Sequence, residues 1–244
     1  YGLSVEEVAA WNAAELLQRL RELRTRYTRE RAAVLGIDRG NPYFELLEND
    51  TVLQNYVAEV KANIGLLSLV DANRDWLSQF EHLIFESGQG LLLDEDYEAY
   101  APHLTSSKTG MHNPALFLAK RGLSLDEAIY VTRSYVTRHG EGPLPCETAR
   151  DKLPGVGADL TNQPNEWQGT LRYARHESMG AFFAPVERDK DSVQLFSSAR
   201  ETKLSILVTH LNETGNRLYF EEGEVSFERV REEGERRGIR CTRI

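Results

Sequence analysis

The chain has 244 residues, of which 41% are hydrophobic and 27% charged, and its 29 basic and 38 acidic residues give a formal charge of −9. This composition is typical of a globular protein, and the acidic balance excludes the usual nucleic-acid binder, which needs a net basic face against the phosphates. No segment approaches the roughly 18 consecutive apolar residues of a membrane span, and the opening residues lack the apolar run of a signal peptide, so we expect a cytoplasmic protein without a membrane segment.

Residues 1–80 are predicted to form a helical subregion. Ser4-Val5-Glu6-Glu7 has the form of a capping box, and apolar residues then recur at helical spacing, which predicts one helix over residues 5–34. A turn follows at residues 36–42. A second apolar series from Val52 to Leu67, continued around Trp76, predicts two or three further helices.

Residues 81–244 are predicted to form an α/β portion. Leu83-Ile84-Phe85 is a short apolar run that ends at Ser87-Gly88-Gln89-Gly90, so it reads as a buried strand that leads into a glycine-rich loop. Residues 226–237, closed by Gly238, predict a helix. Four other segments have strand character: 128–137, 203–208, the weaker 217–219, and 239–244. The predicted fold class is α/β, with an N-terminal helical layer followed by part of a mixed, mostly parallel sheet with flanking helices, in one structural unit.

Several residue patterns could hold an anion, and each has an ordinary structural alternative. Three G-x-G loops, at residues 88–90, 140–142 and 155–157, could cradle a phosphate or could be simple turns. The hydroxyl cluster at residues 105–107 could bind phosphate or cap a helix, and Arg172 and Arg175 could grip a carboxylate or phosphate or be surface arginines. No Gly-Lys pair occurs, so these residues contain no P-loop.

The cysteine and histidine spacing predicts no metal site. Cys146 and Cys241 lack the spacing of metal ligands, and we interpret them as reduced thiols. The histidines show no spacing that requires a metal or a catalytic triad.

Three ordered motifs lie between residues 85 and 147. Residues 85–94 read FESGQGLLLD, residues 104–107 read LTSS, and residues 137–147 read TRHGEGPLPCE. They resemble the F-E-G-A-Q-G-x-L-L-D, V-T-S-S and T-R-x-G-x-G-P-F-P-T-E segments of the adenylosuccinate synthetase family. The resemblance is strong over residues 81–147 and moderate over residues 161–212, and the helices before residue 80 have a compatible pattern.

The resemblance implies the P-loop-related fold of that family without its phosphate loop. The chain would correspond to the central and C-terminal portion of the family's proteins, with both ends absent. It implies a ligase that joins L-aspartate to a purine nucleoside monophosphate, with a nucleoside triphosphate as phosphoryl donor. The monophosphate is IMP in the family, or a guanine-type monophosphate in a divergent branch similar to 2-aminoadenylosuccinate synthetase. Magnesium, with ligands in the absent N-terminal part, and a homodimer are also implied. The alternative is a non-catalytic nucleotide-binding or scaffold relic, and we expect this chain alone to be inactive.

The resemblance also assigns roles to residues. Gln89 contacts the substrate nucleotide near the purine, Thr105 contacts its 5′-phosphate, and Arg172 holds a substrate carboxylate or ribose. The full set of expected substrate-binding residues is Gln89, Gly90, Thr105, Ser106, Arg138, Gly140, Thr170 and Arg172.

The family reads the triphosphate base with a T-K-L-D motif. Two segments compete for this position, and we prefer Thr209 to Asn212 over Thr202 to Ser205, because it follows an apolar strand. The amide of Asn212 offers one donor and one acceptor, which suits adenine, so we expect ATP or dATP to be accepted at least as well as GTP.

Overall fold

The computed structural model describes residues 2–167 and 169–244 and separates the chain into two compact units. The first unit ends at Ala72 and the second begins at Asn73, so the division lies before the short helix α5 (Arg74–Leu77), whereas the sequence placed a boundary after residue 80.

The first unit is helical. It contains α1 (Val5–Ala10), α2 (Ala13–Leu35), α3 (Tyr43–Glu48) and α4 (Asp50–Ile64). The capping box at Ser4 is confirmed, but the single helix predicted over residues 5–34 is wrong. Asn12 adopts an extended conformation and caps α2 in a second capping box with Glu15, which ends one helix and starts the next.

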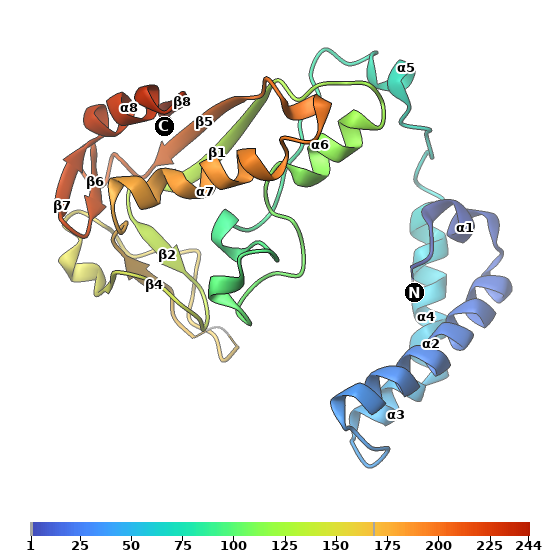
Figure 1. Ribbon diagram of the computed structural model, residues 1–244. Helices are drawn as coiled ribbons and strands as arrows, with labels where there is room; N and C mark the ends of the chain where they lie inside the picture. The colour runs from blue at the N-terminus through green and yellow to red at the C-terminus, as the bar shows by residue number, and fades with distance from the viewer. Residues whose placement is uncertain (1, 168) are drawn as a thin grey trace. The chain divides into compact units, whose positions relative to one another are not determined.

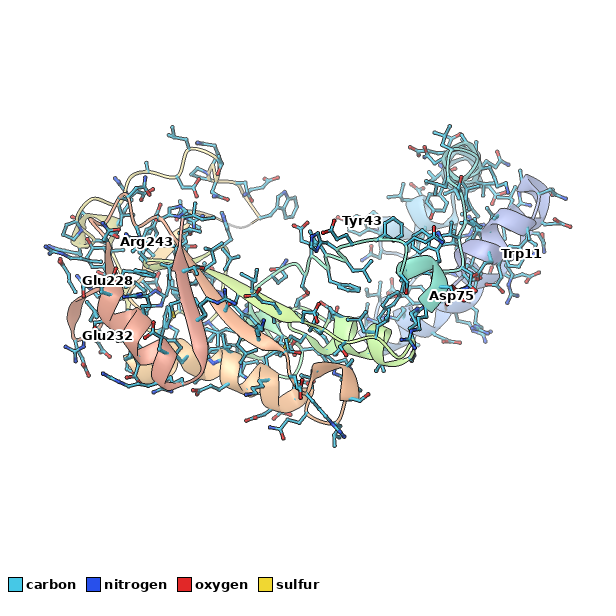
Figure 2. The ribbon with its side chains drawn as sticks, turned by 90° about the horizontal axis from the view of Figure 1, so that it is seen from above. Trp11, Tyr43, Asp75, Glu228, Glu232 and Arg243 are labelled. Carbon is cyan, nitrogen blue, oxygen red and sulfur yellow. The ribbon has the colours of Figure 1, made fainter. Side chains whose placement is uncertain are left out.

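Polar contacts pin α4 against α2 and the end of α1. Arg21 and Arg24 in α2 both bond the carboxylate of Asp50 at the start of α4, and the Lys61 ammonium near its end donates to the carbonyl oxygen of Trp11 at 2.7 Å. Leu16 and Val57 are the buried apolar side chains of this unit among the described residues. Many others are exposed, including Tyr43 on α3, which Figure 2 labels.

The second unit is an α/β assembly (Figure 1). Its longer helices are α6 (His112–Ala119), α7 (Met179–Ser192) and α8 (Phe227–Arg236). Short 3₁₀ turns occur at Leu91–Leu93, Glu98–Tyr100, Arg150–Lys152 and Ser197–Ala199. Its strands are β1 (Glu127–Arg133), β2 (Val136–Arg138), β3 (Glu147–Thr148), β4 (Arg172–Ala174), β5 (Lys203–Thr209), β6 (Arg217–Phe220), β7 (Gly223–Ser226) and β8 (Ile239–Arg243).

The central sheet is parallel, in the order β1-β5-β8, and the α/β class is thereby confirmed. A smaller antiparallel sheet has the order β2-β4-β3, and β6 and β7 form a hairpin. β1 is an edge strand of this sheet. Lys203 N donates to Asp126 O, and Ser134 N donates to Thr209 O, so the even-numbered residues of β1 bond β5. The backbone groups of residues 129 and 131 therefore lie on the side away from β5. The side chains of Ile129 and Val131 are 59% and 66% exposed.

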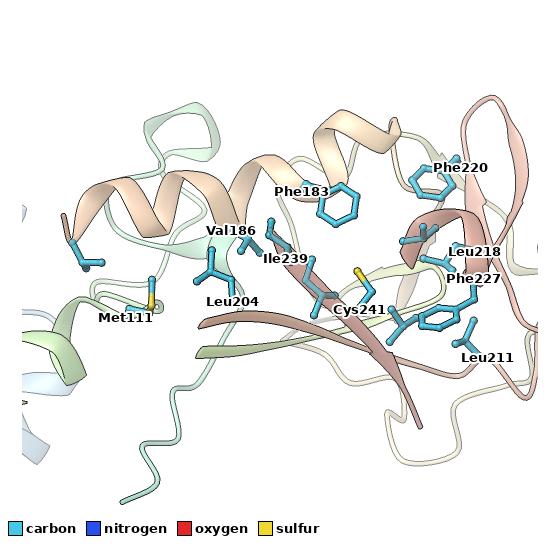
Figure 3. Close-up of a cluster of buried hydrophobic side chains, with 14 of the residues drawn as sticks. Met111, Phe183, Val186, Leu204, Leu211, Leu218, Phe220, Phe227, Ile239 and Cys241 are labelled. Atoms are coloured by element: carbon cyan, nitrogen blue, oxygen red, sulfur yellow. The ribbon is translucent and has the colours of Figure 1, made fainter. Parts of the chain in front are cut away.

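The main core lies between one face of this sheet and two helices (Figure 3). Phe183 and Val186 of α7 pack with Leu204 and Ile206 of β5, and α8 packs on the same face. A side chain at Gly234 of α8 would come within 2.6 Å of the Ile239 carbonyl oxygen, so glycine allows this close helix–sheet contact. The opposite side of α8 carries exposed Glu228 and Glu232 (Figure 2).

Two sequence predictions in this unit are wrong. Residues 83–85 form no strand, and Ile84 is 91% exposed, because a strand needs a hydrogen-bonded neighbour and none of the described residues pairs with this segment. The strand predicted over residues 128–137 is broken at Ser134 and Tyr135, after which β2 joins the other sheet.

Other elements agree with the sequence or were missed. The strands near residues 203–208, 217–219 and 239–244 are confirmed, as is the helix that ends before Gly238. Helices α6 and α7 were not predicted; α7 contains Pro185, which hides its helical pattern.

Candidate functional site

A cavity of about 1120 Å³ lies within the second unit. Its walls come from residues 83–93, from β1 and β2, from residues 175–177 and from α7. This volume is slightly above the usual range of roughly 300–1,000 Å³ for small-molecule sites, so it is sufficient for a nucleotide. Four of the expected site residues line it, namely Gln89, Gly90, Arg138 and Thr209. Six others do not line it, namely Thr105, Ser106, Gly140, Thr170, Arg172 and Asn212.

Gln89 lies in an exposed loop with an unusual backbone conformation. Its φ of 68° is in the left-handed region, which costs a residue with a side chain roughly 1 kcal/mol. The flanking Gly88 and Gly90 have no positive φ, and a Cβ on either would meet no atom within 4 Å. The fold therefore gives no steric reason for glycine at these two positions, and the loop leaves its backbone open to close approach by a ligand.

Thr105 and Ser106 lie in a segment that pairs with the end of the first motif. Thr105 N donates to Leu93 O at 2.8 Å, and Glu95 N donates to Ser107 O at 3.2 Å. Ser106 is exposed, and the hydroxyl of Thr105 is 3.4 Å from that of Ser107. The two motifs are thus adjacent in space although they are separate in sequence.

Arg138 and Arg172 hold the second glycine loop. They are paired in the β2–β4 register. Arg138 donates to the carbonyl oxygens of Glu141 and His103, both at 3.1 Å. Arg172 Nη1 donates to the carbonyl oxygens of Gly140 and Gly142, while its Nε donates to Glu147 Oε1 at 2.8 Å. Most donors of Arg172 are thus used within the protein, and the planar guanidinium already holds one carboxylate.

A polar chain at the cavity rim was missed by the sequence analysis. Arg133 contacts Asp159 at 3.4 Å, Asn162 donates to Asp159, and His139 Nε2 lies 2.6 Å from Asn162 Oδ1. Hydrogen bonds from Thr161 and Asn162 hold the pKa of the Asp159 carboxyl well below its usual range. Because an ionised carboxylate only accepts, the Asn162 NH₂ faces it, and His139 Nε2 carries the proton that the Asn162 oxygen accepts. The one available signal was the Asp-x-x-Asn spacing of a turn.

The candidate triphosphate segment begins at the carboxyl end of β5. Thr209 lines the cavity, and its hydroxyl donates to Thr132 O at 3.0 Å. Asn212 lies in the exposed turn that follows and is not part of the cavity wall. Thr209, the last residue of β5, therefore lines the cavity, whereas Asn212 in the following turn lies outside its wall.

The charged side chains of the cavity favour an anionic ligand, whereas its buried histidine adds no charge. The charged side chains in its wall are Arg133, Arg138 and Arg175 against Glu127 and Glu177, although the whole chain is acidic. Burial lowers the pKa of His176 to about 4, so this cavity residue is neutral at physiological pH.

Comparisons with known proteins agree with these motifs. The sequence model of the adenylosuccinate synthetase family matches residues 2–214. The chain belongs to the adenylosuccinate synthetase family. Its similarity to the adenylosuccinate synthetase of Pseudomonas paraeruginosa is 32% identity over 163 residues, or 67% of this chain and 34% of that protein. The Marinobacter nauticus and Pseudomonas fluorescens enzymes are 34% and 36% identical over 57% and 51% of this chain, and over 31% and 28% of their own lengths.

The chain thus spans about a third of the length of the curated adenylosuccinate synthetases that it matches. Among residues 2–167 and 169–244, no group of three or more His, Cys, Asp or Glu side chains is placed to hold a metal ion. Within the same described ranges, none of the helices has the length and apolar character needed to cross a lipid bilayer.

Proposed function

We propose that the protein carrying this chain is a ligase that joins L-aspartate to a purine nucleoside monophosphate, with IMP as the substrate and a nucleoside triphosphate as phosphoryl donor. The observation that carries the proposal is the cavity wall formed by two motifs of the adenylosuccinate synthetase family, through Gln89-Gly90 and Thr137-Arg138. Because the chain covers about a third of its relatives, the activity is proposed for the whole protein.

The proposed binding mode follows from side-chain chemistry. The Gln89 amide carries a donor and an acceptor, which pair with the edge of a purine. The unused guanidinium donors of Arg138 and the hydroxyl of Thr105 bind the 5′-phosphate, while Gly90 and Ser106 let the backbone approach it closely. Arg172 receives the aspartate carboxylate by exchanging it for Glu147, whose carboxylate it holds at 2.8 Å. Gly140 and Thr170 flank this arginine in the proposed site.

The triphosphate is proposed to bind beside the segment from Thr209 to Asn212. Magnesium would accompany the triphosphate, and since the described residues form no metal-holding group, we derive no catalytic step through it. The protein is proposed to be cytoplasmic.

A homodimer is also part of the proposal. Exposed apolar side chains on the first unit support it, among them Val34, Tyr43 and Leu46 at 74%, 71% and 58% exposure. A helical unit with so few buried residues gains stability when a partner covers such side chains. Sedimentation equilibrium measures the mass in solution, and a monomer at micromolar concentration contradicts this part.

Calorimetric titration of the chain with IMP tests the binding function. We expect saturable binding of IMP and at least tenfold weaker binding of a pyrimidine monophosphate, because the Gln89 amide is matched to the purine edge. No binding of any purine monophosphate overturns the proposal.

Catalysis requires a separate measurement. Phosphoryl transfer depends on charge stabilisation around the γ-phosphate, and the sequence contains no Gly-Lys phosphate loop. We therefore expect no aspartate-dependent phosphate release by the 244-residue chain with IMP, triphosphate and magnesium. A rate well above buffer contradicts this expectation.

A further inference from the structure

Residues 109–111 are held by two carboxylates from distant parts of the second unit. Thr109 N donates to Asp94 Oδ2 at 2.7 Å, and Met111 N donates to Asp189 Oδ2 at 2.9 Å. Between them, a Cβ on Gly110 would overlap the carboxylate of Asp189. A side chain at this position would displace that carboxylate, so glycine allows Asp189 to reach the Met111 amide.

Asp189 connects this segment to the wall of the cavity. It projects from α7 and accepts a second hydrogen bond from the hydroxyl of Tyr130 in β1, at 2.7 Å. Burial and the neighbouring carboxylate raise the pKa of Tyr130 far above its usual value, so the phenol remains a donor. Thr109, Met111 and Tyr130 all line the cavity. The segment is therefore fixed to the same helix and strand that shape the cavity.

Asp94 fixes the other end of the segment. Burial opposes its ionisation, but hydrogen bonds from the amides of Asp96 and Thr109 outweigh burial and hold the pKa of the carboxyl below its usual range. Asp94 is thus an acceptor, and it accepts a hydrogen bond from the Thr109 amide. The Thr109 hydroxyl lies 3.2 Å from Gly90 O and 3.3 Å from Asp94 Oδ2. The hydroxyl is thus within hydrogen-bonding distance of both oxygens, and Gly90 O is the nearer of the two.

The hydrogen bond to Gly90 anchors the loop that carries Gln89. Within the described residues, Thr109 is the residue from another segment whose side chain bonds the backbone of residues 87–90. Gly90 O also accepts a hydrogen bond from Leu93 N at 2.8 Å, which comes from the same segment. The anchor matters because Gln89 has a left-handed φ of 68° between two unconstrained glycines. A loop of this kind reaches other conformations easily unless it is held.

We propose that Thr109, oriented by Asp94, is a positioning residue for Gln89 and thereby sets the recognition of the purine base. This inference rests on the proposed function, because it assumes that Gln89 faces the base. It predicts that Thr109 affects binding of the base and does not affect binding of the ribose or phosphate. A ligand that contains the base should therefore lose affinity when Thr109 is changed, and a ligand without the base should not.

The test compares two ligands on the full chain. IMP contains the base, whereas ribose 5-phosphate contains the sugar and phosphate alone. Thr109→Val removes the hydroxyl at nearly constant size, and we expect it to weaken IMP binding about tenfold while ribose 5-phosphate binding stays unchanged. Thr109→Ser keeps the hydroxyl and should restore IMP affinity to within twofold of the original chain.

A matched control and a double variant complete the experiment. Thr214 is 6% exposed, like Thr109, and also donates to a backbone carbonyl, at Arg217, but lies outside the cavity wall, so Thr214→Val should leave both affinities unchanged. In a Gln89→Ala background, Thr109→Val should have no further effect on IMP affinity, because the side chain that it positions is gone.

Each outcome decides between the proposals. Equal loss of both ligands in Thr109→Val, unchanged IMP affinity, or additive effects with Gln89→Ala overturns the positioning role while the proposed function stands. If the original chain binds no purine monophosphate, the proposed function fails, and the positioning role fails with it.

Discussion

The two glycine loops next to the cavity have the same G-x-G pattern but contain glycine for different reasons. In residues 140–142, Gly140 and Gly142 have φ values of 71° and 111°, and a Cβ on Gly142 would come within 2.7 Å of His103 Cβ and overlap the Arg138 guanidinium. In residues 88–90, neither glycine has a positive φ or a close neighbour, and the left-handed residue is Gln89. The fold requires glycine in the first case and not in the second.

The difference separates glycines that the fold requires from glycines that it does not require. The loop at 140–142 has its carbonyl groups bonded by Arg138 and Arg172, so it is held firmly within the protein. The loop at 88–90 is held at one carbonyl and is otherwise exposed, so no packing contact accounts for its glycines. Five substitutions, one of them a control, test this comparison.

The largest expected effect is on stability at Gly142. Gly142→Ala combines a left-handed φ of 111° with a collision against His103 and Arg138, and we expect it to lower the free energy of unfolding by about 3 kcal/mol. Urea denaturation measures this. Gly140→Ala is the control, because its φ of 71° is strained but its Cβ meets no atom, so about 1 kcal/mol is expected. Equal losses at the two positions contradict the collision.

Gly90→Ala should show the opposite behaviour. Its φ of −113° suits any residue and its Cβ has free space, so the free energy of unfolding should change by less than about 0.5 kcal/mol. A methyl group in the way of the nucleotide should weaken IMP binding about thirtyfold, or about 2 kcal/mol. Paired denaturation and calorimetry check both values. Unchanged IMP affinity shows that Gly90 is required neither for the fold nor for binding, and it contradicts the proposed difference between the two glycine loops.

Asn212 extends the comparison to the loop after β5, which is exposed like residues 88–90. A carboxylate accepts from both N–H groups on the edge of guanine, whereas the Asn212 amide suits adenine. Asn212→Asp should shift the ratio of kcat/KM for GTP over ATP about tenfold towards GTP, or about 1.4 kcal/mol, in the catalytically complete protein. A tenfold preference for GTP in the unsubstituted protein shows that Asn212 does not read the base as proposed.

The sequence predicts those parts of the structure that depend on interactions between neighbouring residues. Ser4, Gly238 and the apolar strand at residues 203–208 were found because caps, stops and alternation are encoded by neighbouring residues. The strand predicted at residues 83–85 failed because strand formation depends on a partner elsewhere in space, and Asn12 was missed because it lies within a continuous apolar pattern.

The site shows the same limit. Its motifs identified the residues in the cavity wall at Gln89 and Arg138, and no pattern within the chain predicted that Thr109 anchors the Gln89 loop or that Arg172 holds Glu147. These contacts join residues that are 19 and 25 positions apart, so they depend on the tertiary fold.

The smallest expected effect concerns the ion pair between Glu147 and Arg172 and its dependence on pH. Hydrogen bonds from Arg172 hold the pKa of Glu147 below its usual value of about 4.5 despite slight burial. A carboxyl with a lowered folded-state pKa stabilises the fold above its unfolded pKa, and this contribution is lost as the pH falls through the folded pKa. Because Glu147 is partly exposed, Glu147→Gln should cost less than about 1 kcal/mol at pH 7, and the cost should shrink as the pH falls below about 4.5.

His176 also makes the free energy of unfolding depend on pH, and this dependence is the same in the original chain and in the Glu147→Gln variant. Its pKa is lowered to about 4 by burial, so protonation of the unfolded state destabilises the fold as the pH falls from about 6.5 towards 4, with or without Glu147. The difference between the two urea curves therefore isolates the ion pair. If that difference stays constant from pH 7 to 2.5, Glu147 acts through packing rather than charge, and the loop at 140–142 is held by the carbonyl contacts of Arg172 without help from its carboxylate partner.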